Sequence, residues 1–176
     1  MGQAVPQDLD YLWVNVAKEH DVYRARFKAK QACESLGMGS YEVAIVETSV
    51  SELGWNLVVH AKGGMLGFRS FEDSYRVGGI KDREFIRTLR YKNRSMILHE
   101  DSEIQIEGIE IVSVDSGPGF LDIEAVFSES YVSKTGLGRG LKSVKGMMDE
   151  FSILSSQGKG ALIWCRKWTR IIQVSL

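Results

Sequence analysis

Hydrophobic positions recur at steps of three and four along residues 40–61, which is the spacing of one face of an amphipathic helix. The apolar positions of this stretch are Val43, Val46, Val50, Leu53, Leu57 and Ala61. Ser40 is expected as the N-cap, and Gly63-Gly64 as the C-terminal stop. An earlier helix is predicted over residues 21–36, where Ala, Arg, Lys and Glu dominate before two glycines.

Stretches rich in β-branched and aromatic residues predict strands later in the chain. The clearest ones span residues 11–16, 109–114, 151–154 and 161–165. The segment 65–103 is less regular, with short strands predicted over 65–71 and 95–98 around a basic amphipathic helix within 81–94. A further helix is predicted over 141–148. Because helices come early and strands late, we expect an α+β sandwich instead of a doubly wound sheet.

Composition narrows the class of protein. The chain has 176 residues, 44% of them hydrophobic, so a single domain with a substantial core is expected over residues 1–176. A net charge of −1 argues against a broadly basic surface for nucleic acid. Cys33 and Cys165 are far apart and match no metal or disulfide spacing. Without a long apolar run or a signal peptide, the chain is predicted to be cytoplasmic and not to bind membranes.

Glu52, Asn56 and His60 follow one another at steps of four, so they are expected on one face of the helix over residues 40–61. An Asn oxygen is a suitable ligand for Mg²⁺, which takes few protein ligands and completes its shell with phosphate oxygens and waters. A carboxylate one turn away can accept or orient the proton of a nucleophile. The same spacing also fits a solvated polar helix face, so this motif alone leaves both interpretations open.

Two glycine-rich turns add further candidate chemistry. Asp115-Ser-Gly-Pro-Gly119 comes directly after a strand, and its carboxylate can accept a hydrogen bond from an exocyclic amine while its glycines allow close approach to a flat ring. Gly136-Leu-Gly-Arg-Gly140 precedes a helix, where backbone N–H groups can bind phosphate oxygens. The alternatives are an ordinary proline turn and a flexible hinge. The second turn fits neither the dinucleotide fingerprint nor the P-loop.

Taken together, these motifs have the order found in the Bergerat-fold (GHKL) ATPases, which the chain resembles over almost its whole length. It is most similar to the bacterial RsbT/RsbW-type serine/threonine switch kinases, the anti-sigma factor kinases of partner-switching stress regulation. The segments that carry the resemblance are VSELGWNLVVHAKGG, IEIVSVDSGPGF, GLGRGLKSVKGMMDEFSILSSQGKG and CRKW. The resemblance implies a two-layer α/β sandwich with a mixed, mostly antiparallel sheet covered by helices on one face.

The resemblance also implies roles for individual residues. Glu52 would be the catalytic carboxylate acting on a partner's hydroxyl, and Asn56 would bind ATP by coordinating Mg²⁺. Asp115 would hold the adenine amine, with Gly117 and Gly119 lining the base.

The remaining nucleotide contacts fall between the first glycine turn and the helix after the second one. Residues 120–135 would form a mobile lid over the nucleotide. The residues expected at the phosphates are Gly136, Leu137, Gly138, Arg139, Gly140 and Leu141. His60 matches the end of the family's helix motif and is expected to be a packed or hydrogen-bonded helix-end residue without a catalytic role.

Two departures from the family pattern bear on function. Ala161 stands after Gly158-Lys-Gly160, where the family usually has a threonine whose hydroxyl supports the adenine-binding aspartate. Loss of one such hydrogen bond, worth about 0.5–1.5 kcal/mol, is expected to weaken nucleotide binding by about two- to tenfold. Residues 65–103 form a longer segment than the family has, interpreted as a partner-specific arm, as an elaborated hairpin, or as a solvated loop or helix.

The resemblance implies an ATP- and Mg²⁺-dependent serine/threonine kinase that phosphorylates a STAS-type anti-sigma antagonist. A sigma factor, a PP2C-type phosphatase and a second copy of the chain are further candidate partners. The alternative is a nucleotide-regulated module that sequesters or activates a sigma factor or phosphatase and turns over ATP slowly or never. A fragment of an ATP-hydrolysing machine and a histidine-kinase domain fit the sequence less well.

Overall fold

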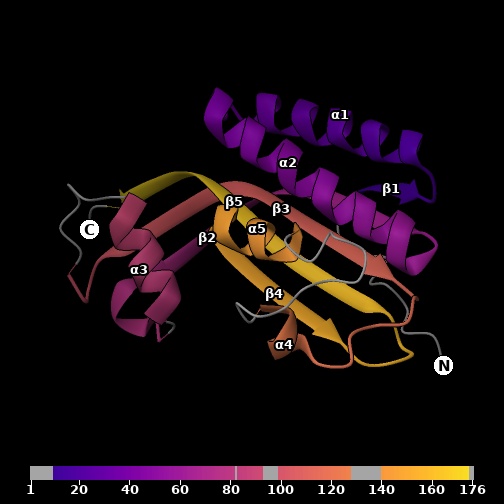
Figure 1. Cartoon of the computed structure of the whole chain (residues 1–176). Coiled ribbons are helices and arrows are strands. Elements are labelled where there is room, and N and C mark those ends of the chain that lie inside the picture. Colours follow the sequence, from indigo (N-terminus) through magenta and orange to yellow (C-terminus); the bar gives the residue numbers. More distant parts are fainter. Residues whose placement is uncertain (1–9, 82, 93–98, 128–139, 175–176) are drawn as a thin grey trace.

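The structure, a computed structural model, describes residues 10–81, 83–92, 99–127 and 140–174. In this part of the chain a five-stranded sheet has the order β1-β2-β3-β5-β4, and its four pairings are all antiparallel (Figure 1). The strands are β1 Leu12–Val16, β2 Gly64–Arg76, β3 Glu103–Asp115, β4 Glu150–Ser155 and β5 Ala161–Val174. The predicted α+β sandwich is confirmed.

One face of the sheet is covered by three helices, α1 Glu19–Ser35, α2 Ser40–Asn56 and α5 Gly140–Met147. Figure 1 shows α1 and α2 side by side along this face. The apolar stripe of α2, with Val46 and Leu53 fully buried, packs in the same cluster as Phe68 of β2 and Ile111 of β3. Both cysteines are free and buried in this core. Burial of this stripe is the main reason the helix forms where the sequence predicts it.

A smaller cluster lies on the opposite face of the sheet, under helix α3 Arg83–Lys92. Phe85 and Leu89 of α3 pack there against Phe71 of β2 and Trp168 of β5. Because side chains alternate along a strand, Phe71 and Phe68 point to opposite faces, so α3 and α2 lie on different sides. A helix on this second face goes beyond the layer arrangement expected from the resemblance.

The long segment between α2 and the third strand forms an extended hairpin. It consists of β2, a 3₁₀ turn at Val77–Gly79, α3 and the beginning of β3. The helix predicted within 81–94 is confirmed as α3, whereas the strand predicted over 95–98 lies outside the described residues.

The strands are longer than predicted. The added part of β3 continues the hydrophobic alternation with the fully buried Ile104 and Ile106, which the prediction did not include. The added parts of β2 and β5 also carry charged side chains that pair across the sheet, such as Arg166 with Asp73. Hydrophobic alternation does not reveal such pairs.

The two ends of the α2 region differ from the sequence expectation. Gly39, with extended φ and ψ, is the N-cap, and Ser40 is the first helical residue, so the prediction of Ser40 as N-cap is wrong by one position. After Asn56 the helix widens into a π-helical turn at Leu57–Ala61, closed by the left-handed Lys62.

No helix in the described ranges is long and apolar enough to cross a membrane.

Candidate nucleotide-binding site

The predicted motifs meet at one end of the sheet, where α2 ends, β3 ends and α5 begins. A Cβ atom placed on Gly140, the first residue of α5, would lie 2.5 Å from Oε2 of Glu52. A Cβ placed on Gly117 would lie 2.7 Å from Cα of Ala61, at the end of the π-helical turn. The structure therefore brings together three segments that are far apart in the sequence. Residues 136–139 of the glycine turn lie outside the described residues.

Glu52 lies on α2 with its carboxylate against the first turn of α5. A helix N-terminus carries a partial positive charge and unpaired N–H groups, so this position suits both the carboxylate and any anion bound nearby. Because Gly140 has no side chain, the Glu52 carboxylate can lie against it; any side chain at position 140 would displace the carboxylate. Leu141 has its side chain in the hydrophobic core, so only its main chain is available to a ligand.

Asn56 stands at the last α-helical position before the π-helical turn. Its Nδ2 atom is buried and has no hydrogen-bond partner among the described residues. A buried amide without a partner costs about 1–3 kcal/mol, which is unusual enough to require an explanation. Single π turns occur frequently at functional sites. The unpaired amide next to such a turn is a feature that a bound ligand would account for.

The π-helical turn also changes the position of His60. An extra residue in the turn rotates the residues after it by about 100° relative to a regular α-helix, so the regular four-residue step from Asn56 is broken. The side chain of His60 is exposed. Of the two expected roles of His60, the packed one is therefore wrong, because it assumed a regular α-helix up to residue 61; the hydrogen-bonded one stays a prediction.

Asp115, the last residue of β3, lies between the main chains of two glycines, Gly64 and Gly160. Its Oδ1 accepts a hydrogen bond of 2.8 Å from the N–H of Gly117, which fixes the carboxylate; Oδ2 has no hydrogen-bond partner within the described ranges. On one side, a Cβ on Gly64 would lie 3.2 Å from Cβ of Asp115, and on the other a Cβ on Gly160 would lie 2.0 Å from its carbonyl oxygen. From the sequence, these two glycines are expected only as a helix stop and a hairpin turn.

The turn after Asp115 is fastened to the hairpin between β4 and β5. Gly119 has φ +65°, and a Cβ there would lie 2.2 Å from the carbonyl oxygen of Ser156, so only glycine fits without strain. The N–H of Gly158 donates to the carbonyl oxygen of Pro118 at 2.7 Å. Two fixed turns thus hold the Asp115 end of the site in one geometry.

Ala161, the residue at the departure from the family pattern, lies directly beside Asp115. It pairs with Asp115 on β3 and with Ser155 on β4. The hydroxyl of Ser155, the β4 partner of Ala161, already donates to the carbonyl oxygen of Gly160 at 2.6 Å and accepts from the N–H of Phe120 at 3.0 Å. Ser155 therefore stabilises the turn and does not replace the missing threonine hydroxyl.

An antiparallel sheet backed by two long helices, with a Glu/Asn pair and a strand-end Asp at one end, has the architecture of the Bergerat nucleotide-binding fold. No protein-family model matches the chain. The chain is homologous to the serine/threonine-protein kinase RsbT of Bacillus subtilis (strain 168), with 29% identity over 161 residues that cover 92% of this chain and 98% of that kinase. The resemblance to RsbT-type switch kinases that the sequence motifs indicate is confirmed by this homology.

Proposed function

We propose that the chain is an ATP- and Mg²⁺-dependent serine/threonine protein kinase that phosphorylates a STAS-type anti-sigma antagonist in a partner-switching system. The homologous protein is a serine/threonine-protein kinase, which implies the use of ATP. The observation that carries the proposal is the placement of Glu52 against the start of α5, where the phosphates would be bound. The same homology supports partners of the partner-switching type.

Asn56 is the residue that fits Mg²⁺. Within the described ranges no cluster of three or more His, Cys, Asp or Glu side chains is placed to hold a metal ion. A single Asn nevertheless suffices for Mg²⁺, which takes most of its ligands from phosphate oxygens and waters. Oδ1 of Asn56 would be the atom that binds Mg²⁺, and a phosphate oxygen beside the ion would accept from Nδ2, which is buried and without a partner among the described residues. Bound Mg²⁺ would neutralise charge on the β- and γ-phosphates.

In phosphoryl transfer the acceptor oxygen forms a bond to the γ-phosphorus while the bridging bond to ADP breaks. Glu52 would orient the acceptor hydroxyl and take its proton, and the N–H groups at the start of α5 would stabilise the phosphate charge. Asp115 would bind the adenine amine through Oδ2. The proposal also includes a single domain over residues 1–176 and a lid over residues 120–135. Of this lid, residues 120–127 are described, and they include the helix α4 Ile123–Phe127.

Phosphotransfer is tested with the purified chain, γ-labelled ATP and a set of STAS-domain proteins. Labelling of one Ser or Thr on a STAS protein is expected, and EDTA is expected to abolish it. Replacement of the labelled residue with Ala controls for the site. Tight nucleotide binding without transfer to any STAS protein would contradict the kinase and favour the nucleotide-regulated binding module, which the missing hydroxyl at Ala161 also supports.

Ala161→Thr is expected to tighten nucleotide binding by about two- to tenfold, because it restores one hydrogen bond beside Asp115. Isothermal titration with a non-hydrolysable ATP analogue measures the change. Ala161→Val is the matched control, since it adds similar volume without a hydroxyl. Equal affinities for the two variants would show that packing, and not the hydroxyl, determines binding at position 161.

A further inference from the structure

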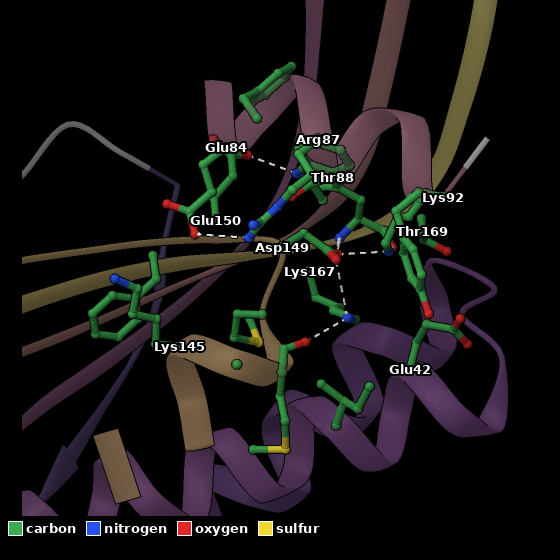
Figure 2. A pocket seen from close by; sticks show the side chains of 18 of the residues that line it. Glu42, Glu84, Arg87, Thr88, Lys92, Lys145, Asp149, Glu150, Lys167 and Thr169 are labelled. Atoms are coloured by element: carbon green, nitrogen blue, oxygen red, sulfur yellow. Dashed lines mark hydrogen bonds and ion pairs between the residues drawn. The ribbon is translucent and has the colours of Figure 1, made fainter. Parts of the chain in front are cut away.

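A hollow of about 1740 Å³ lies apart from the candidate nucleotide-binding site, beside the start of β4 and the part of β5 that has no pairing with β4. We call it the edge cleft; α3 bounds it on one side, and the first turn of α2 and the end of α5 bound it on the other (Figure 2). Glu52, Asn56 and Asp115 do not line it. Its volume exceeds the range of about 300–1,000 Å³ for small-molecule pockets, so a larger occupant such as a polypeptide segment fits better.

The floor of the edge cleft is a saturated polar cluster. Asp149 accepts from Nζ of Lys92 at 2.8 Å, from Nζ of Lys167 at 3.3 Å and from the N–H of Trp168 at 2.7 Å. Lys92 also donates to the carbonyl oxygen of Trp168 at 3.0 Å. These side chains occupy the main-chain groups of Trp168 that would otherwise be offered to another strand. The floor therefore blocks strand pairing at this residue and leaves recognition to the rim.

The rim is basic and aromatic. Arg87, with its side chain 82% exposed, and Lys145 stand on opposite walls, and Arg170 of β5 is exposed as well. Tyr41 and Tyr91 are 73% and 70% exposed. Arg and Tyr are the residue types most enriched where protein interfaces gain their binding energy.

The charge of the edge cleft differs in sign from that of the whole chain. Among the described residues, six Lys and Arg side chains line it against four carboxylates, while the chain has a net charge of −1. Asp149 pairs with both Lys92 and Lys167, and Arg87 pairs with Glu84 at 3.9 Å, so paired charges of both signs are counted here. The excess of two positive charges gives the lining a positive field, and the exposed Arg87–Glu84 pair is weak enough to leave Arg87 accessible to a ligand.

We propose that the edge cleft docks an acidic segment of a protein partner, with its carboxylates on Arg87 and Lys145 and an apolar side chain against the rim tyrosines. Glu42 and Glu84 line the same cleft and would repel a continuous phosphate backbone, so a polypeptide with spaced charges fits better than a nucleic acid. Docking here goes beyond the proposed kinase activity, because neither ATP nor Glu52 takes part.

The probe for this proposal is a displayed library of random 12-residue peptides, selected on the full chain without ATP. We expect the enriched peptides to contain clusters of Asp and Glu. Arg87→Glu/Lys145→Glu is expected to weaken their binding by about tenfold or more. Enriched peptides without acidic clusters, or binding by this variant within twofold of the wild type, would overturn the proposal.

The matched control is Lys28→Glu/Lys30→Glu on α1, which changes the net charge by the same amount away from the cleft. It is expected to bind the peptides as the wild type does; an equal loss would overturn the proposal in favour of general electrostatic attraction. Circular dichroism checks that both variants fold. Peptides with Lys in place of Asp and Glu are expected to bind the Arg87→Glu/Lys145→Glu variant better than the wild type, and their failure to do so counts against the proposal.

Two other occupants are distinguished in the same experiment. Displacement of the peptide by a single-stranded oligonucleotide of equal charge, at equal or lower concentration, would assign the cleft to nucleic acid and overturn the proposal. Sedimentation that detects a dimer lost only in Arg87→Glu/Lys145→Glu would assign it to a second copy, with the same consequence. Because binding is measured without nucleotide, failure here leaves the kinase proposal intact, and failure of phosphotransfer leaves this one intact.

Discussion

Glu52→Gln is expected to lower the turnover of phosphotransfer by about 10²–10⁴-fold, the usual contribution of a general base. The amide keeps the size of the carboxylate against Gly140, so the local packing of α2 on α5 is preserved. It cannot take the proton of the acceptor hydroxyl. ATP affinity is expected to change little, because the proposed ligand to Mg²⁺ is Asn56 and the proposed ligand to adenine is Asp115.

The measurement is single-turnover phosphorylation of the STAS partner, together with a separate titration of ATP. Glu47→Gln is the matched control, since Glu47 lies on the same helix and forms an ion pair with Arg26 at 3.5 Å. Turnover of Glu47→Gln is expected to equal that of the wild type. If Glu52→Gln retains full turnover, Glu52 is not the base; if it loses ATP affinity to the same extent as turnover, its role is in binding.

Elements with a single periodic pattern were predictable from the sequence. The apolar stripe of α2 and the alternating apolar residues of β3 can be read directly from the sequence, because each has one period over its buried residues. Glu52 and Asn56 were found because they share that helix. The placement of Asp115 near them was expected only from the resemblance, since nothing in the local pattern joins the end of β3 to the end of α2.

Features that depend on close backbone contact were not predictable. Gly64 and Gly160 enclose Asp115 because two other strands approach it, and neither approach is encoded next to the glycine itself. The π-helical turn after Asn56 replaces an α-helical turn of ordinary composition. The edge cleft likewise joins Lys92, Asp149 and Lys167, which are widely separated along the chain and form no linear motif.

Glu110→Gln is expected to lower the free energy of unfolding by about 3–5 kcal/mol, the cost of breaking a buried ion pair by removing the charge of one partner. Glu110 is 1% exposed on the face of the sheet that also carries Arg69 and Arg166. Each arginine donates to it at 2.6 Å, and Tyr11 donates to it as well. With a neutral amide in its place, Arg69 would lose its charged partner, and Arg166 would keep only Asp73 at 2.6 Å and Glu150 at 3.8 Å.

Urea unfolding at neutral pH measures this loss. Glu107→Gln is the matched control on the same strand, because Glu107 pairs with the largely exposed Arg170 at 3.5 Å. An exposed pair of this kind contributes about 0–1 kcal/mol, so the control is expected to unfold nearly as the wild type does. Equal losses for the two variants would show that the Glu110 cluster contributes no more than a surface ion pair.

The pH dependence provides an independent check on the same cluster. Burial alone would raise the pKa of Glu110, but the hydrogen bonds from Arg69, Tyr11 and Arg166 together outweigh it, so the pKa lies below its ordinary value of 4.5. A carboxyl whose pKa is lowered by folding stabilises the protein above its ordinary pKa and loses that contribution as the pH falls through the lowered value. The stability difference between wild type and Glu110→Gln should therefore be full at neutral pH and shrink below pH 4.5. A difference that stays constant down to about pH 3 would mean that the loss comes from packing and not from charge.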